Sequence, residues 1–83
     1  MKIKTNINSS YTLGQVMQQG RLQTGMSQRE LAKAIGVSQK WIWEMEQGKP
    51  GLLMNRLFRI LSLIEVELFA EIIVKDKIIN EEA

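Results

Sequence analysis

The chain has 83 residues, a net charge of +2 and 45% hydrophobic residues, and it contains neither cysteine nor histidine. This length supports one domain with a small core, and the hydrophobic fraction is that of a folded protein. Without cysteine or histidine there can be no disulfide, thiolate nucleophile, histidine base or common zinc site. We therefore expect no enzyme activity, no metal and no cofactor.

The charge is divided unevenly along the chain. Residues 1–50 carry seven Lys or Arg against three acidic residues, and residues 51–83 carry four against six. A basic front half suits a polyanion, although an ordinary mixed surface would also explain the difference. No apolar run approaches the roughly 18 residues that span a bilayer, and residues 1–10 lack the apolar core of a signal peptide. A cytoplasmic protein that does not enter a membrane is expected.

The first 24 residues predict an arm followed by a helix. Residues 1–10 alternate apolar and polar side chains, which predicts a flexible or extended N-terminal arm, either a basic tail or a short edge strand. Helical spacing of apolar residues then predicts a helix over about 11–24, which ends at Gly25. Thr12 and Gln15 have capping-box spacing, and three hydroxyls can cap this helix: Ser9, Ser10 and Thr12.

The next segment predicts two short helices separated by a tight turn. Ser27 and Glu30 form a capping box at the start of one helix, and Gly36 ends it. Ser38 caps the next helix, which runs to about Gln47 before Gly, Lys, Pro and Gly break the chain. Side chains expected to pack inward from the two helices, or to allow their close approach, are Leu31, Ala32, Ile35, Val37, Ile42 and Met45.

The C-terminal third predicts a longer helix and one strand. Leucine and isoleucine at helical spacing indicate a helix over about 52–64. Residues 66–74 are rich in β-formers and predict a strand. A single strand leaves its backbone groups unpaired, so we expect it to pair antiparallel with the same strand of a second copy across a two-fold axis. Residues 75–83 are expected to form a mobile tail.

Residues 28–47 meet the requirements of a helix-turn-helix: two short helices, a glycine turn and apolar residues that pack one helix on the other. An ordinary pair of helices joined by a glycine turn would also meet some of these requirements. The residues that carry a closer resemblance follow the pattern Arg21-x₃-Gly25-x-Ser27-Gln28-x₂-Leu31-Ala32-x₃-Gly36-Val37-Ser38-Gln39-x₂-Ile42-x₃-Glu46-x-Gly48. This pattern resembles the Xre/Cro-type helix-turn-helix family. The segment Phe58-Arg59-Ile60-Leu61-Ser62-Leu63, with Glu65 and the β-rich end, is most similar to HipB-type antitoxin repressors.

The resemblance implies a mainly α, lambda-repressor-like fold of four to five helices, with the DNA-binding domain over residues 11–65 and a dimerisation strand over 66–74. It implies a homodimer that binds a palindromic operator in double-stranded DNA and represses its own operon as the antitoxin of a HipA-type kinase toxin. The alternatives are a stand-alone Xre-type regulator and a protein-interaction module that has lost DNA binding. The dimer is expected to form through Phe58, Leu61, Val66, Leu68 and Ile72.

A helical wheel of residues 39–47 places Ile42 and Met45 on the buried side and Lys40, Trp43, Glu44 and Gln47 outward, with Gln39 at the flank. In helix-turn-helix docking the N-terminal part of this helix enters the major groove. Gln39 suits adenine, whereas Lys40 suits guanine or a phosphate. The resemblance gives both a base-facing role and gives Gln28 a phosphate contact. The full set of expected DNA contacts is Ser27, Gln28, Ser38, Gln39, Lys40, Trp43, Gln47 and Lys49.

Three of the expected DNA contacts have a second interpretation. Ser27 and Ser38 are already explained as helix caps. Trp43 lies where the family has a small polar residue, so it contacts either DNA or a protein partner, while Trp41 is expected to be partly buried. The family pattern pairs Arg21 with Glu46 in an internal salt bridge.

Overall fold

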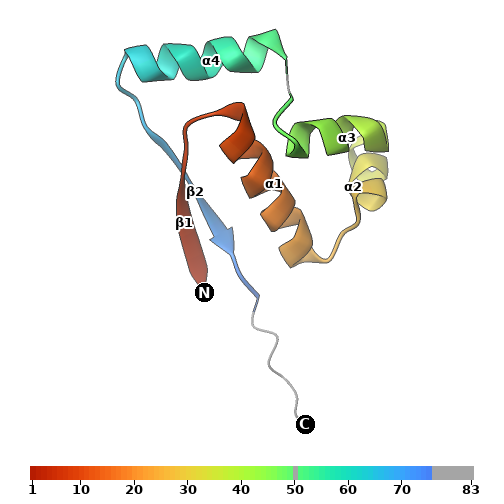
Figure 1. Cartoon of the computed structure of the whole chain (residues 1–83). Coiled ribbons are helices and arrows are strands. Elements are labelled where there is room, and N and C mark those ends of the chain that lie inside the picture. The colour runs from red at the N-terminus through yellow and green to blue at the C-terminus, as the bar shows by residue number, and fades with distance from the viewer. Residues whose placement is uncertain (50, 76–83) are drawn as a thin grey trace.

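The structure is a computed structural model that describes residues 1–49 and 51–75. It consists of strand β1 (Lys2–Ile7), helices α1 (Ser10–Thr24), α2 (Gln28–Ile35), α3 (Gln39–Glu46) and α4 (Leu52–Leu63), and strand β2 (Leu68–Ile73). Figure 1 shows α2 and α3 on one side of α1, the strands on the other, and α4 across one end. The described part measures 51 × 29 × 16 Å, so it is elongated and thin.

Capping side chains begin the first three helices. Ser9 is the N-cap of α1 and forms a reciprocal capping box with Thr12; the box expected from Thr12 to Gln15 is therefore wrong, because α1 begins one turn earlier. Ser27 and Glu30 form the capping box of α2, and Ser38 caps α3 by accepting a hydrogen bond from the Trp41 backbone N–H. These caps satisfy backbone donors that a helix start otherwise leaves unpaired.

The two strands form an antiparallel sheet within one chain. The register joins Lys2 to Ile73 at one end and Ile7 to Leu68 at the other. The inference that the C-terminal strand needs a second copy as its partner is thus wrong, because β1 supplies the partner. The predicted N-terminal arm is extended, and it forms strand β1. The C-terminal strand β2 covers Leu68–Ile73 rather than the predicted 66–74. Of the predicted tail, residues 76–83 lie outside the described residues.

The fully buried apolar core is small. Among the described residues only Ala32 and Ile42 are apolar side chains with less than 5% exposure, at 3% and 4%. Ala32 lies in α2 and Ile42 in α3, so this core holds the two helices against each other. Ile35, which was expected to pack inward, is 56% exposed. It is the last residue of α2, directly before the Gly36 turn.

Two glycines let α1 approach the end of α3. A Cβ on Gly14 would lie 2.5 Å from the backbone oxygen of Met45 and 2.7 Å from that of Glu46. A Cβ on Gly48, whose φ is +80°, would lie 2.7 Å from the Cα of Tyr11. Because no side chain fits at either point, the backbones of α1 and the α3 end are in direct contact. This contact fixes the position of α3 relative to the rest of the chain.

Candidate nucleic-acid interface

The turn between α2 and α3 is closed by Gly36. Its φ and ψ are 76° and 35°, the left-handed region that glycine adopts without strain. The backbone N–H groups of Gly36 and Val37 both donate to the carbonyl oxygen of Ala32, the latter at 3.0 Å. The chain therefore turns tightly after α2, and α3 packs against α2 directly after this turn.

A buried ion pair attaches α3 to α1. Arg21 Nε donates to Glu46 Oε2 at 2.6 Å, and Arg21 Nη2 donates to Oε1 at 3.0 Å. Gln28 Nε2 also donates to Oε1 at 3.0 Å, so side chains of three helices meet at one carboxylate. The Arg21 and Glu46 side chains are only 9% and 2% exposed. Arg21 Nη1 reaches the Met26 carbonyl at 2.8 Å and thereby also fixes the loop before α2.

The pair remains ionised in the fold. Burial acts to raise the pKa of the Glu46 carboxyl, but the hydrogen bonds from Arg21 and Gln28 and the charge of Arg21 outweigh it, so this pKa lies below its usual value. The hydrogen bond to Glu46 raises the pKa of Arg21. Two opposite charges with satisfied hydrogen bonds are what a buried pair requires. Arg21 and Glu46 are therefore structural residues that hold α3 in place.

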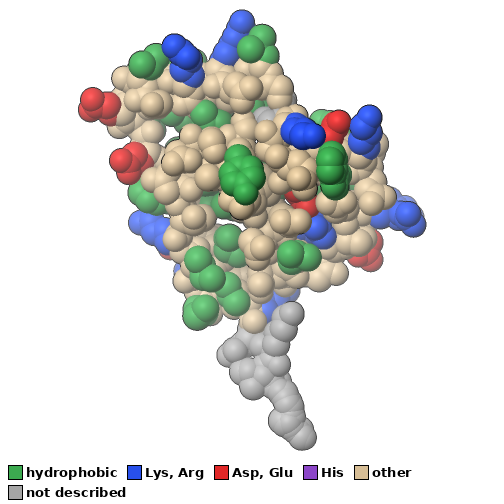
Figure 2. Space-filling model, viewed as in Figure 1, with side chains coloured by type: hydrophobic (Ala, Val, Ile, Leu, Met, Phe, Trp, Pro, Cys, Tyr) green, Lys and Arg blue, Asp and Glu red, His purple; other side chains and the backbone are tan. Residues whose placement is uncertain are grey.

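The opposite side of α3 is exposed and polar. Gln39, Lys40 and Gln47 are exposed, and Trp43 is 44% exposed between them. Glu44 is half-buried at the edge of this face, and Trp41, on the other flank, is 45% exposed, so it is only partly covered. Figure 2 shows Lys and Arg side chains along this edge of the molecule and over α4. The face offers amide, ammonium and aromatic groups that suit base edges and phosphates.

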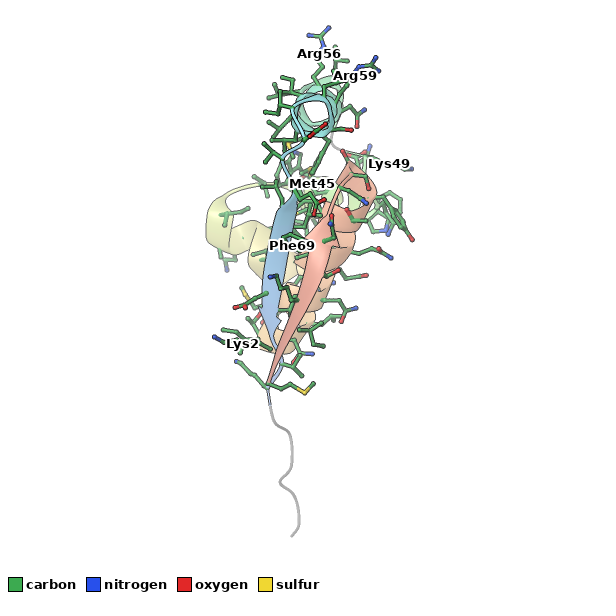
Figure 3. All side chains as sticks on the ribbon, turned by 90° about the vertical axis from the view of Figure 1, so that its left-hand side faces the viewer. Lys2, Met45, Lys49, Arg56, Arg59 and Phe69 are labelled. Carbon is green, nitrogen blue, oxygen red and sulfur yellow. The ribbon has the colours of Figure 1, made fainter. Side chains whose placement is uncertain are left out.

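Lys49 extends this face beyond the end of α3. Its ammonium lies 5.3 Å from the centre of the Trp43 ring, which is within the range of a cation–π contact. Figure 3 shows Lys49 and Arg59 projecting to the same side of the molecule, away from Lys2. A positive charge therefore lies directly beside the exposed tryptophan.

The other expected contacts have roles within the fold. Ser27 and Ser38 accept backbone hydrogen bonds as caps, from Glu30 N–H and Trp41 N–H, each at 3.0 Å. A hydroxyl that accepts in this way keeps its own hydrogen to donate, so capping leaves a phosphate contact open to both serines. The Gln28 side-chain amide donates a hydrogen bond to the Glu46 carboxylate, and the sequence pattern did not indicate this hydrogen bond.

The residues expected at the dimer interface lie on different faces. Phe58 and Leu61 are half-buried and line, with Val66, a cavity of about 550 Å³ between α4 and the end of the sheet. Ile72 is half-buried on the side of the sheet that faces α1, beside Val16. Leu68 is 39% exposed. Three of these five side chains are thus partly covered by their own chain.

Two contacts of the site were missed from sequence. Gly14 precedes Arg21 by two helical turns, so both lie on the face of α1 that meets the end of α3. That spacing was the available signal for the close approach. The contact between Lys49 and Trp43 spans the helix end, and no periodic pattern indicates it.

The arrangement of α2 and α3 defines the structural class of this domain. Two short helices joined by a glycine turn, with the second held from behind by a buried ion pair and exposed on its polar face, form a helix-turn-helix. The family described as "Helix-turn-helix domain" matches residues 12–68, more than half of the chain, so the chain belongs to that family. Comparison with curated proteins and with solved structures gave no match.

Two further observations concern the part of the chain that the structure describes. It holds no helix long and apolar enough to cross a membrane. It also holds no group of three acidic side chains placed to bind a metal ion.

Proposed function

We propose that this protein is a sequence-specific DNA-binding regulator that inserts α3 into the major groove. The observation that carries the proposal is the exposed face of α3, with Gln39, Lys40 and Gln47 around Trp43, on a helix whose other side is fixed by Arg21 and Glu46. Direct readout needs such a rigid helix with amide and cationic groups pointing outward.

Particular roles follow from the chemistry of these side chains. Gln39 pairs with the N6 and N7 atoms of adenine, and Lys40 reaches guanine O6 and N7 or a phosphate. Lys49, Ser27, Ser38 and the free part of the Gln28 amide contact the DNA backbone, which sets the register but not the sequence. Trp43 contacts thymine methyl groups or sugars, with Lys49 beside it.

The finer role proposed is repression of the protein's own operon by a homodimer on a palindromic operator. Two recognition helices about 34 Å apart would enter successive major grooves. The resemblance to HipB-type antitoxins adds a HipA-type kinase as partner. A kinase encoded beside this chain that copurifies with it would support the antitoxin role, and its absence would favour a stand-alone Xre-type regulator.

The test is a titration of the protein into its own upstream DNA and into a scrambled duplex of equal length, at about 150 mM salt, followed by tryptophan emission. Binding to the upstream duplex at least ~10³-fold tighter supports the proposal. The variant Lys40→Glu should lose this binding, while Lys33→Glu, with the same charge change on exposed α2 surface, should keep most of it.

Equally weak binding of both duplexes by the folded protein would contradict the operator claim. The exposed Trp43 would then favour the alternative of a protein-interaction module, with this tryptophan as the anchor of the interface.

A further inference from the structure

The turn that follows α3 is held in a fixed position. The backbone N–H of Gly48 donates to the Met45 carbonyl oxygen at 3.1 Å, and that of Lys49 donates to the Glu44 carbonyl oxygen at 3.0 Å. Gly48 also packs against Tyr11 of α1, where a Cβ on the glycine would come within 2.7 Å of the Tyr11 Cα. Because hydrogen bonds to α3 and a close contact with α1 hold this turn, the point from which the Lys49 side chain starts is defined.

The Lys49 side chain lies against an aromatic ring and not against a carboxylate. Its ammonium is 5.3 Å from the centre of the Trp43 ring, and it forms no ion pair among the described residues. The ring attracts the ammonium but carries no formal charge, so it restricts the flexible lysine stem without neutralising the cation. A carboxylate in the same place would neutralise the ammonium and repel a phosphate. Lys49 therefore keeps its full attraction for an anion.

Trp43 lies on the flank of the recognition helix and in its C-terminal half. At 100° per residue, Trp43 is about 80° from the line opposite the buried Ile42, whereas Lys40 is about 20° from it. In helix-turn-helix docking the N-terminal part of the helix contacts the base edges. The flanks of a helix in the major groove face the sugar–phosphate strands that form the walls of the groove. This place on α3 therefore suits a contact with the DNA backbone better than a contact with a base.

We propose that Trp43 is a positioning residue: one face of its ring holds the Lys49 ammonium where this group binds a phosphate of DNA. The inference rests on the proposed function and deepens it, because it selects the sugar–phosphate backbone as the partner of Trp43 and leaves the reading of bases to Gln39 and Lys40. A lysine that is already oriented loses less conformational freedom when it binds. The tryptophan then strengthens binding to every sequence and does not select among sequences.

The salt dependence of binding tests the role of Lys49. Fluorescently labelled duplexes of the upstream DNA and of the scrambled sequence are titrated by anisotropy at salt concentrations from about 50 to 200 mM. Lys49→Met should weaken binding to both duplexes by the same factor and should lower the slope of log affinity against log salt by about 1, because one phosphate contact is lost. An unchanged slope would overturn the proposal.

The role of Trp43 is tested by removing its ring and by replacing it with a smaller one. Trp43→Leu should weaken binding to both duplexes by about two- to fivefold, which is the size of an exposed cation–π contact. Trp43→Phe, which keeps an aromatic face, should recover most of this loss. Because the ring is 44% exposed, circular dichroism should show both variants folded. A loss confined to the upstream duplex would mean that Trp43 reads bases, and it would overturn the proposal.

The coupling between the two side chains is measured with the double variant Trp43→Leu/Lys49→Met. Because the ring acts through the lysine, the loss caused by the leucine should be smaller in the Lys49→Met protein than in the wild type. Losses that simply multiply would show that the two side chains act independently, which would overturn the proposal.

A second lysine–aromatic pair provides the matched control. The Lys4 ammonium lies 4.7 Å from the centre of the Phe69 ring, on the strands, which Figure 1 shows on the other side of α1 from α3. Lys4→Met and Phe69→Leu also remove one charge and one aromatic ring, but they should change neither the affinities nor the salt slope. Equal effects of the two pairs would reflect net charge alone and would overturn a specific role for Trp43 and Lys49.

Failure of this inference is distinguishable from failure of the proposed function. If the wild type discriminates between the two duplexes but the Trp43→Leu and Lys49→Met losses multiply, only the inference is wrong. If the wild type binds both duplexes equally but these losses are coupled, only the sequence-specific role is wrong.

Discussion

At the scale of single residues, one carboxylate connects three helices. Glu46 accepts hydrogen bonds from Arg21 in α1 and Gln28 in α2. The resemblance to a family pattern was enough to pair Arg21 with Glu46. It was not enough to include Gln28, because a phosphate contact and an internal hydrogen bond require the same type of side chain. Burial decides between such roles, and burial depends on packing that a sequence does not display.

Removal of Glu46 should be costly. Glu46→Ala leaves the almost buried Arg21 guanidinium without its partner, and we expect a loss of about 3–5 kcal/mol in the free energy of unfolding. Urea denaturation measures this loss. The control is Glu44→Ala, because Glu44 forms no ion pair among the described residues, and it should cost less than about 0.5 kcal/mol. Equal losses for the two variants would contradict a structural role for the pair.

Acid should weaken the fold through the same group. The pKa of Glu46 is lower in the folded state than in the unfolded chain, so its stabilising effect is fully present above the unfolded value of about 4.3 and is lost as the pH falls through the folded value. We expect the free energy of unfolding to decrease from about pH 5 downward. Urea midpoints measured across this range should fall less steeply for Glu46→Gln than for the wild type.

At the scale of elements, the local signals and the long-range contacts differ in what they reveal. Serine caps, glycine stops and apolar periodicity placed the four helices and the C-terminal strand within one or two residues of the observed ends. The partner of β2 was not predicted, because β1 lies more than 60 residues away in the sequence and its alternation also fits a free arm. Strand pairing over such a distance leaves no periodic trace in either strand.

Two glycines of α1 provide a matched test of how the elements meet. Gly14→Ala would place a methyl group 2.5 Å from the Met45 carbonyl oxygen, so α1 and α3 must separate, at a cost of about 1–3 kcal/mol. Gly20→Ala meets nothing within 4 Å, and it should stabilise the fold by about 0.5–1 kcal/mol because alanine favours a helix. Thermal unfolding of both variants gives the comparison, and a stabilising Gly14→Ala would contradict the direct backbone contact.

At the scale of the whole molecule, the thin shape goes together with a small core and with apolar side chains of α4 that remain exposed, such as Leu53 and Ile60. A chain with only two fully buried apolar side chains among its described residues would gain stability from any partner that covers more of its apolar surface. The sequence indicated dimerisation, but it pointed to the strand and to the inner side of α4. The structure shows that this inner side is already partly covered by its own chain, because Met54, Phe58 and Leu61 are half-buried there.

Selection from a pool of random duplexes tests whether α3 reads a DNA sequence, without knowledge of the operator. After several rounds of binding at about 150 mM salt, we expect enrichment of one motif with two-fold symmetry and half-sites about one helical turn apart. In the Gln39→Ala protein, selection should relax at one base pair in each half-site, corresponding to about 1–3 kcal/mol of lost discrimination. A folded wild-type protein that enriches no sequence would contradict the claim.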